Sequence, residues 1–165
     1  MAIEPALTDR HYLGIDVGTS GCRSCLIDAD AQTLAEVRTP LPAPVRNGAA
    51  VQQDAEIWWS ALGENLDQLS SQHGLSAVAA MTLDGTSATL LCCGKDGIPS
   101  GPALMYNDAR ATKQAQHVAG LAPSDCAAHG PSASLAKLLW LLQAGSCNQA
   151  GHCLHQADWL LGRLC

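Results

Sequence analysis

The sequence is short of positive charge. Its 165 residues carry 9 lysines and arginines against 15 aspartates and glutamates, which gives a formal net charge of −6 and a pI near 5.3. This balance argues against a basic face for nucleic acid or anionic lipid, but it allows a small anionic ligand held locally by backbone amides and a metal ion. We therefore expect a small-molecule ligand and no nucleic-acid partner.

Long apolar runs are also missing. None approaches the roughly 20 residues needed to cross a bilayer, and the start, MAIEPALTDRH, lacks the apolar block of a secretory signal. We expect a cytoplasmic protein without a membrane partner. Apolar residues still make up 47% of the chain, enough to bury the core of one domain of ordinary size.

Eight cysteines do not form a recognisable metal or disulfide framework. Without a secretory signal, all eight cysteines are expected to be reduced, and those inside apolar runs are expected to act as small hydrophobic residues. Cys22 and Cys25 have a metal-motif spacing, but positions three apart on a strand face opposite sides. A second polar group has no matching Cys-x-x-Cys partner, so we do not expect a functional site there. It consists of Cys147, His152, Cys153 and His155, which are expected to lie in a polar connection between elements.

No Gly-x-x-x-x-Gly-Lys-Ser/Thr loop is present, which excludes the P-loop route to nucleotide binding. The chain has instead the stretch YLGIDVGTSGCRSCLID, in which an apolar run ends on Asp16 and turns through Gly-Thr-Ser-Gly. A bare hairpin asks only for residues that tolerate positive φ, and Gly18 and Gly21 would suffice. The carboxylate and the hydroxyls of Thr19 and Ser20 need another explanation.

A second apolar run, residues 77–83, also ends on an aspartate before Gly-Thr-Ser, in LDGTSATLLCC. It reads as a strand buried on both faces. Ligands of open α/β sheets collect outside the carboxyl ends of strands, so Asp16 and Asp84 are expected to share a site.

A phosphate near Asp16 would be repelled by about 4 kcal/mol at about 4 Å with an effective dielectric constant near 20. The carboxylate therefore fits such a site only with a cation such as Mg²⁺ between the two, or with a sugar hydroxyl as its partner. Turn amides and hydroxyls supply uncharged donors to phosphate or sugar oxygens. The alternative is that Asp16 caps the turn and that Thr19 and Ser20 are ordinary turn residues.

The remaining pattern predicts an α/β layered domain. An antiparallel meander comes first, and a proline-rich stretch at residues 40–48 reads as a loop. The expected elements are strands at residues 12–16, 23–28 and 33–39, a helix from Asp54 to about residue 72, strands at 77–83, 90–93 and 103–106, and helices from Asn107 or Asp108, from Ser132 or Ser134, and over residues 157–164.

The stretch GIDVGTSGCRSCLID resembles the first phosphate motif of the actin, hexokinase and chaperone ATPase superfamily. Three further segments, VQQDAEIWW, ALMYNDAR and SLAKLLWLL with LHQADWLLGRL, resemble the FGGY carbohydrate kinases. The resemblance implies a ribonuclease H-like α/β domain with a mixed sheet flanked by helices. Residues 1–11 would be a polar leader and residues 12–165 an incomplete first domain, with the second, nucleotide-binding domain absent from this chain.

The resemblance also implies roles for individual residues, with ATP and Mg²⁺ as cofactors. Asp16 would be catalytic, serving magnesium through water together with the phosphate. The general base would be an aspartate of the missing second domain, so the isolated chain is expected to be inactive. The phosphate-binding residues would be Gly18, Thr19 and Ser20, and the sugar-binding residues Ser20, Gly21, Asp84 and Ser87. Asp84 would either orient the sugar pocket or hold the Gly85 turn.

The segment LDGTSATLLCC separates subfamilies, since xylulose kinases typically carry Gln-x-His-Gly at this place. Asp-Gly-Thr-Ser-Ala-Thr resembles instead the D-ribulose kinases of plants and cyanobacteria, which implies phosphorylation of D-ribulose to D-ribulose 5-phosphate. A xylulose or other polyol kinase is the alternative within enzymes. A non-catalytic sugar-binding or interaction module left by truncation is the alternative of another class.

Overall fold

The structure, a computed structural model, describes residues 10–147 and 151–165. Its contacts divide the chain into two compact units. The first unit comprises Met1–Pro42 with Ile57–Gly85, and the second comprises Ala43–Glu56 with Thr86–Cys165. Within the described ranges, no helix is long and apolar enough to cross a membrane.

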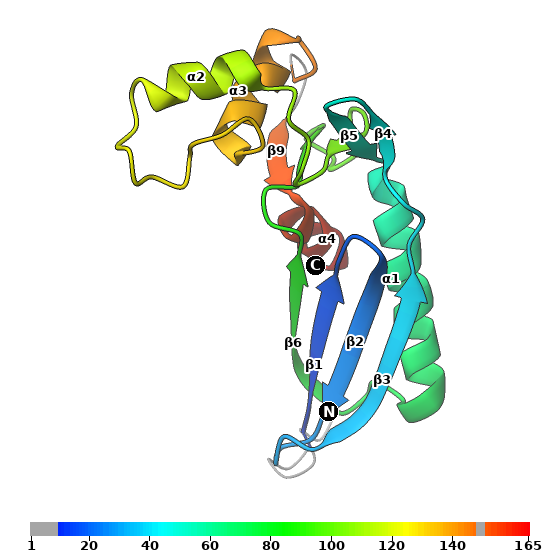
Figure 1. Cartoon of the computed structure of the whole chain (residues 1–165). Helices are drawn as coiled ribbons and strands as arrows, with labels where there is room; N and C mark the ends of the chain where they lie inside the picture. Colours follow the sequence, from blue (N-terminus) through cyan, green and yellow to red (C-terminus); the bar gives the residue numbers. More distant parts are fainter. Residues whose placement is uncertain (1–9, 148–150) are drawn as a thin grey trace. The chain divides into compact units, whose positions relative to one another are not determined.

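The first unit is a mixed four-stranded sheet of order β3-β2-β1-β6 (Figure 1). The first three strands form the predicted antiparallel meander, and β6 joins the sheet parallel to β1. The strands are β1 (His11–Val17), β2 (Gly21–Ile27), β3 (Thr33–Pro40) and β6 (Val78–Gly85).

Helix α1 (Ala55–His73) lies along one face of this sheet, and the strands alternate accordingly (Figure 1). Leu13, Ile15 and Val17 of β1 are buried, whereas Asp16 between them is exposed. The side-chain amide of the buried Asn65 on α1 donates to the Cys22 carbonyl at 3.2 Å. The face with Asp16 is therefore the one directed away from α1.

Strand β6 differs from the prediction that it is buried on both faces. It is one of the two edge strands of the first unit, and in its apolar run only Leu83 is buried, at 7% exposure, while Met81 is 42% exposed. The prediction relied on the apolar composition of this run, which is typical of a central strand. Alanine and methionine can also lie exposed on an edge strand, so composition alone does not distinguish the two positions. The strand itself and its position along the chain are confirmed.

The second unit contains a five-stranded antiparallel sheet of order β4-β5-β8-β7-β9. Its buried cluster of Leu90, Cys92, Leu104 and Leu141 lies between the sheet and α3. The elements are β4 (Val45–Asn47), β5 (Ala50–Gln53), β7 (Leu90–Cys93), β8 (Ala103–Leu104), α2 (Thr112–Ala119), α3 (Ser134–Gln143), β9 (His152–His155) and α4 (Gln156–Leu164).

Three local predictions in this unit are wrong. The loop at residues 40–48 contains β4, because the last of its prolines precedes Val45 and the Asn-Gly pair, with Gly48 at φ +58°, closes a hairpin to β5. The polar stretch at 152–155 is strand β9, paired with β7. Helix α2 begins at Thr112 rather than near Asp108, whose carboxylate is engaged elsewhere.

The prediction that all cysteines are reduced is wrong for two of them. Cys92 of β7 and Cys147, which follows α3, form a disulfide with their Cα atoms 5.9 Å apart. The two are 55 residues apart in sequence, so no local spacing could indicate the pair. Cys22 and Cys93 are free and fully buried, as expected of small hydrophobic residues.

Candidate phosphate and sugar site

Asp16 and Asp84 lie side by side in the first unit. They are register partners in the parallel pair β1 and β6, both are exposed, and both are at the carboxyl ends of their strands. The equivalent placement predicted from the sequence is confirmed. Two adjacent carboxylates at a strand end repel each other, and a cation or hydrogen-bond donors relieve that repulsion.

The turn after Asp16 closes through its own backbone. The Gly18 amide donates to the Gly21 carbonyl at 3.0 Å, and the Ser20 carbonyl accepts from the Leu41 amide at 3.1 Å. Neither glycine has a positive φ, so the turn does not use the tolerance of glycine for that conformation. Gly21 is favoured for another reason: a Cβ there would lie 3.0 Å from the Thr39 carbonyl oxygen on β3, which is a tight contact. The turn therefore does not need the Asp16 carboxylate as a cap.

Charged residues continue across the same face of the sheet. Arg23 on β2 is the register partner of Asp16, and Arg38 on β3 is the register partner of Arg23. A groove of about 650 Å³ runs along this face and is lined by all three side chains among others. Two guanidinium groups thus lie on the side of Asp16 opposite Asp84, where their positive charge is available to an anionic ligand and is partly offset by Glu36, which lines the same groove.

Asp84 also has a local structural role. One of its carboxylate oxygens accepts a hydrogen bond from the Gly85 amide at 2.8 Å. This contact is the one expected if Asp84 holds the turn, and it occupies one of the two carboxylate oxygens.

Ser87, the remaining sugar-binding candidate, lies in the second unit on the turn between β6 and β7. It is exposed, and the next residue, Ala88, has the unusual φ of +58°. The Thr86 amide and hydroxyl both donate to the Gln156 side-chain oxygen at 2.8 Å, and the Thr86 and Thr89 hydroxyls are 2.6 Å apart. The turn that presents Ser87 is therefore held on both sides.

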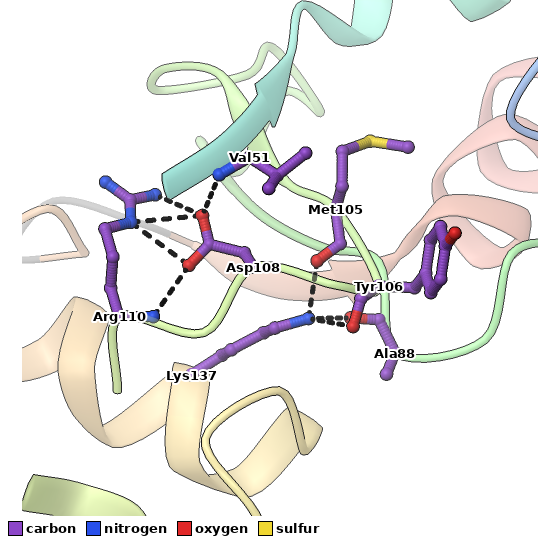
Figure 2. A network of polar contacts seen from close by, with 7 residues as sticks. All are labelled: Val51, Ala88, Met105, Tyr106, Asp108, Arg110 and Lys137. Carbon is purple, nitrogen blue, oxygen red and sulfur yellow. Dashed lines mark hydrogen bonds and ion pairs between the residues drawn. The ribbon is translucent and has the colours of Figure 1, made fainter. Parts of the chain in front are cut away.

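Lys137 of α3 supplies the strongest support for this turn (Figure 2). Its side chain is fully buried, and its Nζ donates to the backbone carbonyls of Ala88 at 2.8 Å, Met105 at 2.6 Å and Tyr106 at 3.2 Å. An ammonium group has three protons to donate, so each of the three carbonyls receives one. The lysine joins the Ser87 turn to the segment that follows β8.

A second buried contact fixes that segment. The fully buried Asp108 carboxylate accepts from the Val51 amide at 2.8 Å and pairs with the Arg110 guanidinium, whose Nη2 lies 2.8 Å away (Figure 2). The Arg110 guanidinium also lies over the Trp140 ring, 4.5 Å from its centre. The ALMYNDAR segment is therefore a structural brace in the second unit.

Sequence reasoning did not identify Lys137 or Gln156. The signal for Lys137 was present, since it is the only charge in the apolar helix SLAKLLWLL, on the same helical face as the buried Leu141. A lone charge on a buried face indicates a specific buried partner. Gln156 carries no comparable signal.

Lys137 should leave a signature in the pH dependence of stability. Burial lowers the pKa of Lys137 from 10.5 to about 8, with the Asp108 carboxylate opposing the shift. Between these values the unfolded chain binds more protons than the folded one, so the free energy of unfolding should rise with pH, by up to roughly 3 kcal/mol. Urea unfolding of the wild type and of Lys137→Met across this range measures it.

The unfolded chains of both proteins carry the same cysteines, whose thiols ionise in this pH range, so the difference between the two unfolding free energies isolates Lys137. We expect that difference to increase from pH 8 to pH 10.5. A difference that stays constant would show that Lys137 keeps its ordinary pKa in the folded chain.

Solved structures place the fold. The chain superposes on a xyloylose kinase from Brucella ovis with a TM-score of 0.83 at 23% identity, over 92% of this chain and 34% of that one. It superposes on the glycerol kinase of Plasmodium falciparum, a structure with ADP, with a TM-score of 0.75 at 14% identity, over 92% and 33%. The predicted fold class is confirmed: an α/β domain with a mixed sheet and flanking helices.

The profile of the N-terminal domain of the FGGY family of carbohydrate kinases matches residues 11–165, and the chain belongs to this family. It is 29% identical over 136 residues to the xylulose kinase of Escherichia coli, covering 79% of this chain and 28% of the relative. It is 27% identical over 161 residues to the xylulose kinase of Klebsiella pneumoniae, covering 93% and 33%. The chain thus spans a third or less of the length of these relatives.

Proposed function

We propose that the complete protein containing this chain transfers the γ-phosphate of ATP to a ketopentose, with D-ribulose as substrate and D-ribulose 5-phosphate as product. One observation carries the proposal: the exposed Asp16 carboxylate stands beside Asp84 at a strand end, next to a turn that closes without it. Family membership and the xylulose kinases among the relatives support the reaction class.

On the phosphate side, we assign Asp16 to hold Mg²⁺ through water. A bound Mg²⁺ would neutralise charge on the transferring phosphoryl group. Exposed carboxylate oxygens suit this hard cation, and the neighbouring Arg23 keeps the local charge from being wholly negative. Thr19 and Ser20 would donate hydrogen bonds to phosphate oxygens from the turn, and Gly18, whose amide already donates to the Gly21 carbonyl, would let the turn backbone lie close to the phosphate.

On the sugar side, we assign Ser20, Gly21, Asp84 and Ser87 to the ketopentose. The Gly85 amide uses one oxygen of the Asp84 carboxylate, and a sugar hydroxyl would donate to the other. The support from Gln156 and Lys137 would keep the Ser87 hydroxyl in place as the substrate binds, which lowers the entropic cost of positioning the sugar.

Xylulose is the second candidate substrate, favoured by the names of the curated relatives. D-ribulose is preferred here because Asp-Gly-Thr-Ser-Ala-Thr, residues 84–89, departs from the xylulose-kinase pattern. Kinetic profiling of the complete gene product with D-ribulose, D-xylulose and polyols distinguishes the two. If kcat/KM is higher for D-xylulose than for D-ribulose, D-xylulose is the substrate instead. Because ATP is the proposed phosphate donor, we also propose a cytoplasmic location.

The general base and the adenosine pocket would lie in a second domain outside these residues, so we expect the isolated chain not to turn over ATP and sugar. Catalysis requires the hydroxyl, its base and the γ-phosphate to be held together. Sugar contacts without an opposing domain compete with water, so we expect millimolar affinity or weaker, on the order of 4 kcal/mol or less.

NMR titration with D-ribulose and D-xylulose, beside a coupled ADP-release assay, tests both parts of this prediction. Magnesium-dependent ADP release that rises with added ketopentose and disappears in Asp16→Asn would contradict the need for a second domain. A complete gene product that binds sugar but never releases ADP would instead favour the non-catalytic module.

A further inference from the structure

Three cysteine sulfurs meet in the second unit, and none of these cysteines is among the residues assigned above. The Sγ atoms of Cys92, Cys147 and Cys153 all lie within 4.8 Å of one another. Cys92 is on β7, Cys153 is its register partner on β9, and Cys147 follows α3. Cys92 is buried, whereas the other two are half-buried and within reach of solvent.

The distance from the free Cys153 sulfur to Cys92 suits one ligand shared by the three sulfurs once the Cys92–Cys147 bond is opened. Tetrahedral thiolate coordination of Zn²⁺, with bonds of about 2.3 Å, places sulfurs about 3.8 Å apart. The Sγ atoms of Cys92 and Cys153 are 3.9 Å apart. Thiol–disulfide exchange needs three sulfurs in a line, with the outer two about 6 Å apart, and a triangle with sides within 4.8 Å does not provide that.

We propose that these three cysteines, when reduced, bind one Zn²⁺ as thiolates and leave its fourth position to water. Two equivalents of a thiol reductant supply the two electrons that open the Cys92–Cys147 disulfide and are themselves oxidised to a disulfide. The three thiols release their protons to solvent as the metal binds. The disulfide is then the oxidised, metal-free form of the same site.

The neighbouring Cys93, His152 and His155 side chains are directed elsewhere and do not compete with the three sulfurs as ligands. Cys93 and His152 follow and precede the Cys92–Cys153 pair on their strands and so face the other side of the sheet. His155 is also engaged elsewhere, with its Nε2 2.9 Å from the Ser134 hydroxyl. Of the polar group noted in the sequence, only Cys147 and Cys153 contribute, and Cys92 completes the set.

Cobalt titration of the whole chain tests the proposal. After anaerobic reduction with a phosphine, which opens the disulfide without supplying thiols, one equivalent of Co²⁺ should give an intense thiolate-to-metal absorption band that Zn²⁺ abolishes. Cys153→Ser should weaken Co²⁺ binding more than about 100-fold, because it removes one of three ligands. Cys126→Ser, which changes an exposed cysteine outside the cluster, should leave it unchanged.

Alkylation of the wild type gives a readout that needs no variant. Six thiols should react under denaturing conditions before reduction, against eight in the sequence, and Zn²⁺ should protect Cys92, Cys147 and Cys153 in the reduced chain. Protection of no cysteine, or of Cys126 and Cys165 equally, would overturn the site. A charge-transfer band of equal strength in folded Cys153→Ser would do the same.

Discussion

Replacing Asp16 with asparagine in the complete enzyme is expected to lower turnover roughly a hundredfold or more while leaving stability almost unchanged. The amide keeps the shape of the side chain but removes the charge that would position the metal and the phosphate. Asp16 is exposed and adjacent to a second carboxylate, so losing its charge breaks no core contact and removes a like-charge repulsion. Steady-state kinetics beside thermal unfolding measures both effects.

Asp67→Asn is the matched control for this experiment. It makes the same chemical change at an exposed position of α1 in the same unit, and we expect normal turnover. Near-normal turnover of Asp16→Asn would reduce Asp16 to an ordinary turn residue. A large loss of melting temperature in that variant would also point to a structural role.

Lys137→Met should lower the free energy of unfolding by about 2–4 kcal/mol at neutral pH. Methionine matches the lysine stem in length but leaves three backbone carbonyls without their donor. The buried ammonium carries a desolvation cost, which its lowered pKa reflects, and removing it recovers part of the loss. The net effect is a loss of stability, because the three carbonyls stay buried without a hydrogen-bond donor.

Urea unfolding of Lys137→Met beside Lys113→Met measures this loss. Lys113 is an exposed lysine of α2 in the same unit, so its substitution should change the free energy of unfolding by less than about 0.5 kcal/mol. Equal stability of the two variants would mean that water satisfies the three carbonyls once the lysine is gone. In the complete enzyme, Lys137→Met should also raise KM for the sugar, since it frees the turn that presents Ser87.

Local patterns in the sequence were sufficient to predict most elements of the first unit. Period-two alternation located the meander, and Asp54 with the apolar spacing after it located α1, where the Glu56 amide donates to the Asp54 carboxylate at 3.0 Å. The parallel alignment of Asp16 with Asp84 was also predictable, because both follow apolar strands and precede similar turns. These features depend on neighbours in sequence or on general rules of sheet topology.

Features that depend on distant residues were not predictable in this way. The exposure of Met81 follows from the edge position of β6, which its composition does not encode. The Cys92–Cys147 bond and the contact of Lys137 with Ala88 join residues 55 and 49 positions apart. Asp108 resembles a helix cap in sequence, yet its carboxylate accepts from Val51, 57 residues earlier. Tertiary contacts overrode the local signal in each case.

The most direct test of the proposed function is ADP release by the complete gene product, with D-ribulose or D-xylulose as acceptor and with Mg²⁺ present or removed. We predict Mg²⁺-dependent release that requires a ketopentose, has its highest kcat/KM with D-ribulose, and is lost in Asp16→Asn but not in Asp67→Asn. Release that is independent of added sugar, or that persists unchanged in Asp16→Asn, would contradict the assignment of this strand end as the phosphate site of a sugar kinase.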